Sequence, residues 1–389
     1  MSEHIITGID VGTYQIKVAI VRAPKKKSER SVPHIIGTGY AESRGLRNGY
    51  IISPTDVVRS IRSAVAMAEK NAGVSVKRAY VSLGSIGLDE ITTTGEVITS
   101  RADSEITTID IEKAQQDSED RIMDRIPNRK IIHTIPLRYR VDGEEVLGKP
   151  QGMHGTKLEV DTLCITTFEQ HLNDLIGAIE QTGIYVEDVM ASPIAASFVL
   201  LSKTQRRAGC VLANVGAETV SIVIYEDTIP ISLKIFPIGA NDITNDIALG
   251  LKIPLEEAEK IKRGGITSAT YSKKRLDEII TARVTDIFEL IQIHLRQIKK
   301  DGLLPAGIIL TGGGSSTVGI QELARTHLDL PARIATLDVG KNTKMRDASW
   351  AVAYGLCMIG ASSGEESTNI GIVKQTRHSI LTWFSQFLP

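Results

Sequence analysis

The sequence has few cysteines, no long hydrophobic run and no export signal. Cys164, Cys210 and Cys357 are its three cysteines among 389 residues, and each lies in an apolar run without paired spacing. This pattern favours buried thiols in a reducing compartment over disulfides or a metal site. No run approaches the ~18 apolar residues of a membrane span, and no basic-then-apolar signal opens the chain. We therefore predict a cytosolic location.

An excess of charge of either sign is also lacking. The chain has 45 Lys and Arg against 46 Asp and Glu, a formal net charge of −1. Bulk attraction to nucleic acid is thereby excluded, so we expect no nucleic-acid partner and only local patches for anionic surfaces. With 42% hydrophobic and 23% charged residues, the chain is long enough for two domains or for one body with two lobes.

Residues 8–17 predict a hairpin whose turn binds phosphate. Apolar residues on both sides are typical of strands, and Gly12 is expected to supply the positive φ of a tight turn. The N–H groups of such a turn form an anion-binding concavity, to which Thr13 and Lys17 add a hydroxyl and a positive charge. Asp10 would repel phosphate, so we expect its carboxylate to hold Mg²⁺ through water. Taken alone, so short a pattern is more often an ordinary turn than a nucleotide site.

Strand and helix patterns then follow one another. Helical spacing predicts a helix over residues 54–73, between strands at 35–41 and 80–83. From 85 to 167 the pattern changes to further strands and a charged helix over 110–125. This stretch is predicted to be an inserted α+β module.

The second half of the chain repeats the opening pattern. Residues 210–224 again indicate strand, turn and strand. A buried strand over 308–311 leads into a Gly-rich turn at 312–315, where a flat ring could lie against bare backbone. Small residues at 192–197 and 348–355 are expected to let two helices cross closely at a hinge.

This order of features resembles the actin-like superfamily, with two phosphate turns about 200 residues apart and a third glycine turn about 100 residues later. Within it the chain resembles the FtsA family of bacterial cell-division proteins. The resemblance covers nearly the whole chain and is carried by residues 237–248, residues 258–262 and the module at 85–167, which lies where that family has its subdomain 1C. It implies an α/β, actin-like two-lobed ATPase fold with an inserted α+β, SHS2-like subdomain in place of actin's small first-lobe subdomain.

The same resemblance divides the chain into subdomains. It implies a first-lobe core at 1–84 and 168–197, the inserted subdomain at 85–167, a second-lobe core at 198–232 and 303–360, a small second-lobe subdomain at 233–302, a linker at 361–376 and an amphipathic helix at 377–389.

Binding of ATP and Mg²⁺ between the lobes is a further implication of the resemblance. The two phosphate turns would grip ATP from opposite sides, a Glu-x-x-Lys helix would reach the ribose, and the Gly-rich turn would hold adenine. These roles fall on Asp10, Gly12, Thr13, Tyr14 and Lys17 in the first turn; on Asn214, Gly216, Ala217, Glu218 and Thr219 in the second; on Gly239, Asn241, Glu259 and Lys262; and on Gly312, Gly313, Gly314 and Ser315.

Asn214 departs from the family pattern. Relatives normally have Asp here, and glycines where this chain has Ala217 and Glu218. An amide can bond to phosphate or to metal-bound water, but it lacks the carboxylate charge that helps hold Mg²⁺ or orient the attacking water. With Asp10 and Asn214 as the candidate catalytic residues, we expect ATP binding with at most slow hydrolysis. That Asn214 is only a turn former stays an open alternative.

The last 30 residues combine a linker pattern with an amphipathic one. Residues 361–375 are rich in Ser, Gly, Glu and Thr, which is typical of a flexible linker. After them, a short helical pattern contains one of the chain's two Trp and two of its six Phe. The basic residues Lys374, Arg377 and His378 precede this pattern in the sequence. We predict a helix that lies on an anionic membrane surface, rather than one docked on the protein's own body. Its apolar face would consist of Ile380, Leu381, Trp383, Phe384, Phe387 and Leu388.

The resemblance implies a division protein that forms filaments and links FtsZ to the cytoplasmic side of the membrane at the division site. The C-terminal peptide of FtsZ would bind residues 233–302, and other division proteins would be further partners. Arg296 and Lys300 are candidate contacts, although the plain interpretation is a solvated helix face. Two alternatives stay open: a PilM-type pilus-assembly adaptor of the same fold and a sugar-kinase-like phosphotransferase. Asn214 argues against the second, because a kinase needs a catalytic carboxylate.

Overall fold

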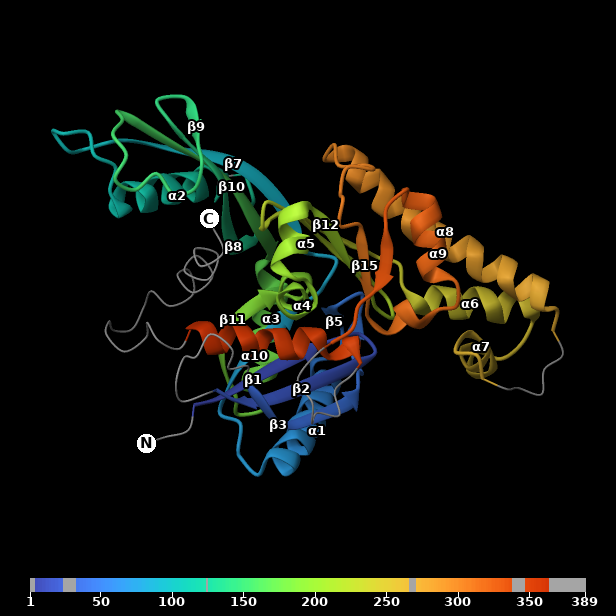
Figure 1. The fold of residues 1–389 in the computed structure, drawn as a ribbon. Coiled ribbons are helices and arrows are strands. Elements are labelled where there is room, and N and C mark those ends of the chain that lie inside the picture. The colour runs from blue at the N-terminus through green and yellow to red at the C-terminus, as the bar shows by residue number, and fades with distance from the viewer. Residues whose placement is uncertain (1–3, 24–32, 124, 266–270, 338–346, 364–389) are drawn as a thin grey trace.

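The computed structural model describes residues 4–23, 33–123, 125–265, 271–337 and 347–363 (Figure 1). The strands of this part of the chain form two five-stranded sheets, one four-stranded sheet and a two-stranded ribbon. We call each five-stranded sheet with its helices a lobe, the first and the second in chain order. The four-stranded sheet belongs to a module at one end of the molecule (Figure 1).

The first lobe has the strand order β11-β6-β1-β2-β3. β1 and β2 form the predicted antiparallel hairpin, β6 runs parallel to β1, and β11 runs parallel to β6. A short ribbon of β4 and β5 follows β3. The strands are β1 (Ile5–Val11), β2 (Gln15–Arg22), β3 (His34–Glu42), β4 (Leu46–Arg47), β5 (Tyr50–Ile51), β6 (Arg78–Leu83) and β11 (Tyr185–Ala191).

Helices cover both faces of this sheet. A Cβ on Gly39 would clash with the backbone of α1, and a Cβ on Gly8 would clash with the backbone of α10, so both helices lie close to the strands. Gly39 pairs with Val18 and Gly8 with Ala19. Because neighbouring residues of a strand face opposite sides, α1 and α10 cover opposite faces. The helices of this lobe are α1 (Pro54–Ala72), α3 (Glu169–Glu180), α4 (Ser192–Leu200) and α10 (Ala351–Ser363), while the short α5 (Lys203–Ala208) packs against the sheet of the second lobe.

The inserted module has the strand order β7-β10-β8-β9, with α2 packed against the sheet. Gly95 of β7 allows this close approach, because a Cβ there would clash with the backbone of α2. The predicted α+β character and charged helix are confirmed, whereas the short β9 was not predicted. The elements are β7 (Asp89–Ile98), α2 (Thr108–Met123), β8 (Arg129–Val141), β9 (Glu144–Val146) and β10 (Lys157–Phe168).

The second lobe repeats the topology of the first. Its order is β14-β13-β12-β15-β16, with β12 antiparallel to β13 and parallel to β15. β12 and β13 therefore correspond to β1 and β2, and β15 to β6, which confirms the predicted repeat. The elements are β12 (Cys210–Val215), β13 (Val220–Glu226), β14 (Ile229–Phe236), α6 (Ala240–Leu251), α7 (Leu255–Lys262), α8 (Lys273–Gln297), β15 (Ile308–Thr311), η1 (Gly313–Ser316), α9 (Ile320–Leu328), β16 (Ala332–Ile334) and η2 (Ala348–Trp350).

The two small-residue helices cross closely, as predicted. A Cβ on Gly355 of α10 would clash with the carbonyl oxygen of Ala195 in α4. Around this crossing, apolar side chains of both lobes form one continuous core. The three cysteines are free and buried, as expected, and burial raises the pKa of each thiol to about 12.

The prediction that Gly12 has a positive φ is wrong. Glycine is needed there for a steric reason, because a Cβ would lie 2.9 Å from the carbonyl oxygen of Gln15. Among the described residues, no helix combines the length and apolar character needed to cross a bilayer.

Candidate functional site

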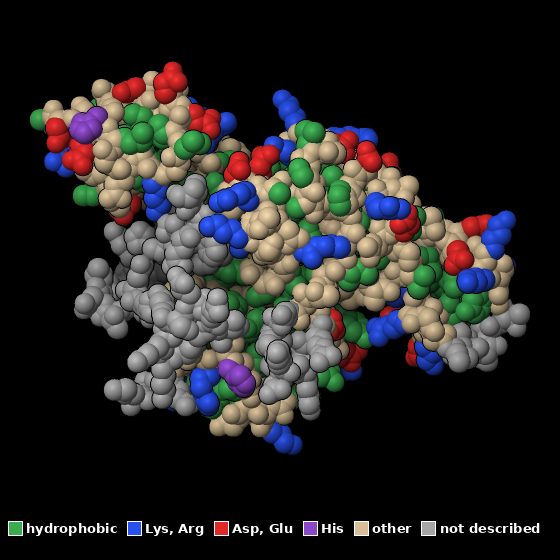
Figure 2. Space-filling model, viewed as in Figure 1, with side chains coloured by type: hydrophobic (Ala, Val, Ile, Leu, Met, Phe, Trp, Pro, Cys, Tyr) green, Lys and Arg blue, Asp and Glu red, His purple; other side chains and the backbone are tan. Residues whose placement is uncertain are grey.

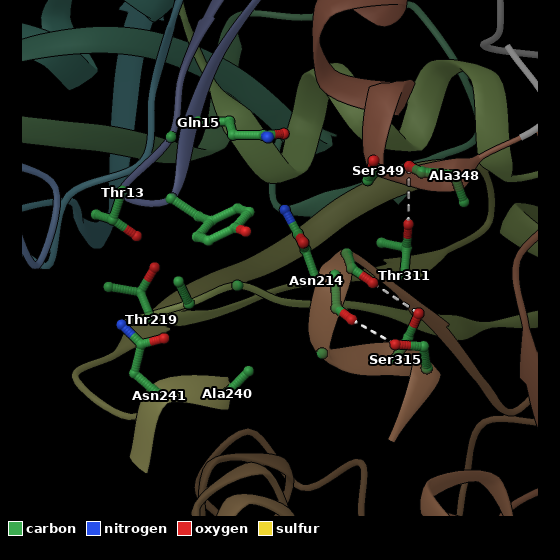
Figure 3. A pocket seen from close by; sticks show the side chains of 18 of the residues that line it. Thr13, Gln15, Asn214, Thr219, Ala240, Asn241, Thr311, Ser315, Ala348 and Ser349 are labelled. Carbon is green, nitrogen blue, oxygen red and sulfur yellow. Dashed lines mark hydrogen bonds between the residues drawn. The ribbon is translucent and has the colours of Figure 1, made fainter. Parts of the chain in front are cut away.

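A cavity of about 1460 Å³ lies between the lobes and is lined by residues of both (Figure 3). The structure thus brings together residues from Asp10 to Val352, which lie far apart in the sequence. The predicted site residues that line it are Asp10, Gly12, Thr13, Tyr14, Lys17, Asn214, Gly216, Ala217, Thr219, Asn241, Glu259, Lys262, Gly312, Gly313, Gly314 and Ser315.

Asp10 lies at the end of β1, just before the first turn. Its Oδ1 accepts a hydrogen bond of 2.8 Å from the Ser82 hydroxyl, which in turn accepts one of 3.1 Å from the N–H of Val11. Burial raises the pKa of Asp10 above its ordinary value, while the nearby Lys17 lowers it. Among the described residues, none donates a hydrogen bond to the second carboxylate oxygen of Asp10. That oxygen is available to a ligand in the cavity.

Lys17 pairs with Asp10 across the β1–β2 hairpin. Its ammonium donates hydrogen bonds of 2.8 Å to both the carbonyl oxygen and the hydroxyl of Ser349, and lies 5.6 Å from the centre of the Trp350 ring. Burial lowers its pKa, which Asp10 and Asp347 partly oppose. Lys17 thus connects the first turn to η2 and places a positive charge in the cavity wall.

The second turn has the same backbone geometry and less charge. A Cβ on Gly216 would lie 2.8 Å from the carbonyl oxygen of Thr219. In the first turn, a Cβ on Gly12 would lie 2.9 Å from the carbonyl oxygen of Gln15. Asn214 pairs with Ser221 across the second hairpin, in the positions that Asp10 and Lys17 have in the first. Both charged residues of the first hairpin are therefore neutral in the second. In Figure 3, Asn214 points into the cavity between Thr219 on one side and Thr311 on the other.

The N-terminus of α6 supports the second turn from behind. The N–H groups of Ala240 and Asn241 donate hydrogen bonds of 2.9 and 2.8 Å to the carbonyl oxygens of Gly216 and Ala217. Gly239, which caps this helix, is not in the cavity wall, and a Cβ there would clash with Ala217. Gly239 was predicted to contact the cofactor; the structure gives it the role of letting α6 reach the turn.

α7 presents an ion pair to the cavity. The Lys262 ammonium lies 2.6 Å from Glu259 Oε2 and also donates to the carbonyl oxygen of Ala240, at 2.9 Å, and to the Thr244 hydroxyl, at 2.7 Å. Burial opposes ionisation of Glu259, but its hydrogen bonds outweigh this effect and lower its pKa. Burial lowers the pKa of Lys262, which Glu259 partly counteracts.

The Gly-rich turn after β15 forms the wall beside the second turn. Gly312 has a φ of 84°, and a Cβ on it would clash with the side chain of Asn214. Gly313 is open: a Cβ there would meet nothing within 4 Å. The Ser315 hydroxyl donates a hydrogen bond of 2.7 Å to the carbonyl oxygen of Gly312 and closes the turn (Figure 3). Bare backbone therefore faces the cavity, as predicted.

Glu218 was predicted to line the cavity, but it does not. Its carboxylate accepts a hydrogen bond of 2.6 Å from the backbone N–H of Asn48 in the first lobe. Other residues that were not predicted to belong to the site also line the cavity, among them Ser82, Thr244, Arg263 and Ser349. Thr244 lies within residues 237–248 and Ser349 within residues 348–355, but neither motif marks them as cavity residues, and only the folded chain brings the four side chains to the wall.

The candidate partner and membrane residues lie elsewhere. Arg296 is paired with Asp301 at 2.9 Å, and Lys300 with Glu226 at 2.6 Å, so both are engaged within the chain. On the face shown in Figure 2, basic and acidic side chains are interspersed without a block of one sign. The predicted membrane residues, Ile380, Leu381, Trp383, Phe384, Phe387 and Leu388, lie outside the described residues.

Two lobes of equal topology with paired hairpin turns around one cavity define the actin-like ATPase fold. Solved structures with this fold agree. A PilM-PilN type IV pilus biogenesis complex has a chain that matches with a TM-score of 0.68 and 16% identity, over 92% of this chain and 98% of that one. MreB5 of Spiroplasma citri bound to ADP matches with a TM-score of 0.51 and 13% identity, over 90% of this chain and 94% of that one.

The chain belongs to the FtsA family of cell-division proteins. The family described as "Cell division protein FtsA" matches residues 211–355, and the "SHS2 domain inserted in FTSA" matches residues 89–166. The cell division protein FtsA of Borreliella burgdorferi is 30% identical over 86% of this chain and 85% of its own length. The cell division protein FtsA of Bacillus subtilis is 28% identical over 91% of this chain and 83% of its own length.

Proposed function

We propose that the chain is a nucleotide-dependent adaptor. It binds ATP with Mg²⁺ between its lobes, self-associates into filaments and attaches FtsZ to the cytoplasmic side of the membrane at the division site. The observation that carries the proposal is the pair of equivalent turns, at Gly12 and Gly216, that face one cavity in a chain of the FtsA family. The subdomain boundaries given above belong to the same proposal.

The donors in the cavity fit Mg²⁺ bound together with a phosphate chain. Asp10 has a carboxylate oxygen free of protein donors, and among the described residues no group of three or more His, Cys, Asp or Glu side chains could hold a metal by itself. Asp10 would therefore hold the ion through water, and the phosphates would supply the remaining ligands. When bound, Mg²⁺ neutralises phosphate charge. Thr13 and Thr219 would contribute hydroxyls, and Lys17 a positive charge.

The rest of the nucleotide would lie toward the second lobe. The ribose fits beside Glu259 and Lys262, whose ion pair lines the wall. The adenine ring fits against the bare backbone at Gly313, where a Cβ would meet nothing within 4 Å.

Hydrolysis would be slow, because the second hairpin supplies no carboxylate. Asn214 can hydrogen-bond to a water molecule but cannot accept its proton at neutral pH. The same point weighs against a sugar-kinase-like phosphotransferase. The likeness to the PilM chain concerns the fold alone, at 16% identity, and family membership favours division over pilus assembly.

FtsZ would bind the small subdomain of the second lobe, at residues 233–302. Arg296 and Lys300 could receive an acidic peptide only by exchanging their present partners, Asp301 and Glu226. Exchange of the exposed Arg296 pair costs little, since such a pair contributes about 0–1 kcal/mol, whereas the Lys300 pair is partly buried and costs more to exchange. This keeps both residues available as contacts at the edge of the surface.

Membrane attachment would depend on residues 377–389. About ten residues are too few for a stable helix in water, so the segment would fold as its apolar face enters the lipid. The ordering cost leaves one copy weakly bound. In a filament, neighbouring tails act at high effective concentration, so assembly would strengthen attachment by orders of magnitude.

The test is binding to anionic vesicles by the full chain, by a chain ending at Gln375 and by Trp383→Glu, with ATP affinity measured on all three. We expect both variants to lose vesicle binding and to keep the ATP affinity of the full chain. Vesicle binding by the truncated chain, or loss of ATP binding on truncation, would favour a helix docked on the protein's own body.

A further inference from the structure

The two turns reach across the cavity in opposite directions. Gly12 and Gly216 occupy equivalent positions, because a Cβ on either would lie 2.9 or 2.8 Å from the carbonyl oxygen three residues later. The residue two positions after the glycine is Tyr14 in the first lobe and Glu218 in the second. Each of these side chains contacts the opposite lobe.

Glu218 contacts a tightly packed part of the first lobe. Its carboxylate accepts the 2.6 Å hydrogen bond from the N–H of Asn48, in the turn between β4 and β5. The carbonyl oxygen of Asn48 accepts a hydrogen bond of 3.2 Å from the N–H of Ile86, after β6. A Cβ on the neighbouring Gly49 would lie 2.5 Å from the Cα of Ser85, so this turn has little room to move. Separation of the lobes would therefore break the Glu218 contact.

Tyr14 makes the converse contact with the second lobe. Its hydroxyl accepts a hydrogen bond of 3.3 Å from the Arg263 guanidinium, whose carbon lies 5.7 Å from the centre of the Tyr14 ring. Arg263 is held in turn by Glu259, at 2.7 Å. This contact also spans the cavity and would break on opening.

We propose that Glu218 and Tyr14 are a pair of latches that hold the lobes together and slow the release of nucleotide. The proposal rests on the proposed function in taking nucleotide as the occupant of the cavity. Glu218 is the stronger latch, because its hydrogen bond is 2.6 Å long against 3.3 Å for that of Tyr14, and both bonds include one charged partner. Tyr14 offers a neutral acceptor at a longer distance. Since Glu218 is not in the cavity wall, it acts as a positioning residue and not as a nucleotide ligand.

The test compares Glu218→Ala and Tyr14→Phe with Glu322→Ala. Glu322 pairs with Arg325 on the same helix of the second lobe, so its removal takes away a carboxylate without affecting the cavity. The measurements are the release rate of a fluorescent ATP analogue with Mg²⁺, and the distance between spin labels on α1 and α8 in nucleotide-free protein. We expect Glu218→Ala to speed release about tenfold and to lengthen the distance. Tyr14→Phe should have a smaller effect, and Glu322→Ala none.

Unchanged release and unchanged distance in Glu218→Ala would overturn the latch. Failure of the wild-type chain to bind the analogue would contradict the proposed function instead, and the distance in nucleotide-free protein would still test the latch. If Glu218→Ala does not fold, as judged by urea unfolding, Glu218→Gln replaces it. The amide keeps an acceptor oxygen but loses the charge. The Glu218→Gln protein should therefore release nucleotide faster than wild type, by less than about tenfold.

Discussion

Replacement of Gly313 should separate nucleotide binding from folding. A Cβ on Gly313 meets nothing within 4 Å, whereas Gly312 has a φ of 84° and a Cβ there would clash with Asn214. Gly313→Leu should therefore leave the free energy of unfolding within about 1 kcal/mol of wild type. Gly312→Ala should lower the free energy of unfolding by about 1–3 kcal/mol through backbone strain alone.

The Leu side chain would occupy the space in which the adenine ring is proposed to lie. We expect the affinity for ATP with Mg²⁺ to fall at least about 100-fold, or about 2.7 kcal/mol. Calorimetric titration measures the affinity, and urea unfolding checks the fold. Gly313→Ala is the graded control, with a smaller loss because its methyl group fills less of the space. Wild-type affinity in a folded Gly313→Leu protein would refute the assignment of this turn to the nucleotide.

Three further predictions concern other parts of the chain. Asn214→Asp should raise ATP turnover at least about tenfold by supplying a proton acceptor; equal turnover would mean that Asn214 is only a turn residue. Reversal of charge at Arg296 and Lys300 together should weaken binding of the FtsZ C-terminal peptide about threefold to tenfold, and unchanged affinity would remove these residues from the surface. Gly355→Val should destabilise the fold by at least about 3 kcal/mol in urea unfolding, because its side chain would enter the backbone of α4; an unchanged midpoint would contradict the close crossing.

Local patterns in the sequence predicted much of the fold. α1 begins at Pro54 and ends at Ala72, and Gly73 caps it with a φ of 70°, as its periodicity and end signals indicate. The repeated hairpins could be predicted for the same reason, since alternation and turn residues are local. β14 was missed: Pro230 lies within it, and proline argues against a strand unless the strand is at the edge of a sheet. β14 is at the edge of its sheet.

Contacts between distant residues could not be predicted. Lys17 was assigned to phosphate from its position after a turn, but its bonds to Ser349, 332 residues away, follow from the folded chain. Glu218 was assigned to the cavity by its place in the second turn. Nothing in that motif indicates that its carboxylate accepts a hydrogen bond from the backbone N–H of Asn48. A glycine in a motif likewise does not reveal whether it is needed for its φ or for close packing, as Gly12 illustrates.

Recruitment of FtsZ to anionic lipid vesicles tests the adaptor role most directly. FtsZ is sedimented with vesicles and ATP in the presence of the full chain, of a chain ending at Gln375, or of neither. We expect FtsZ in the vesicle pellet only with the full chain, because the tail supplies the attachment to lipid. FtsZ in the pellet with the truncated chain, or FtsZ left in solution while the full chain sediments with the vesicles, would contradict it.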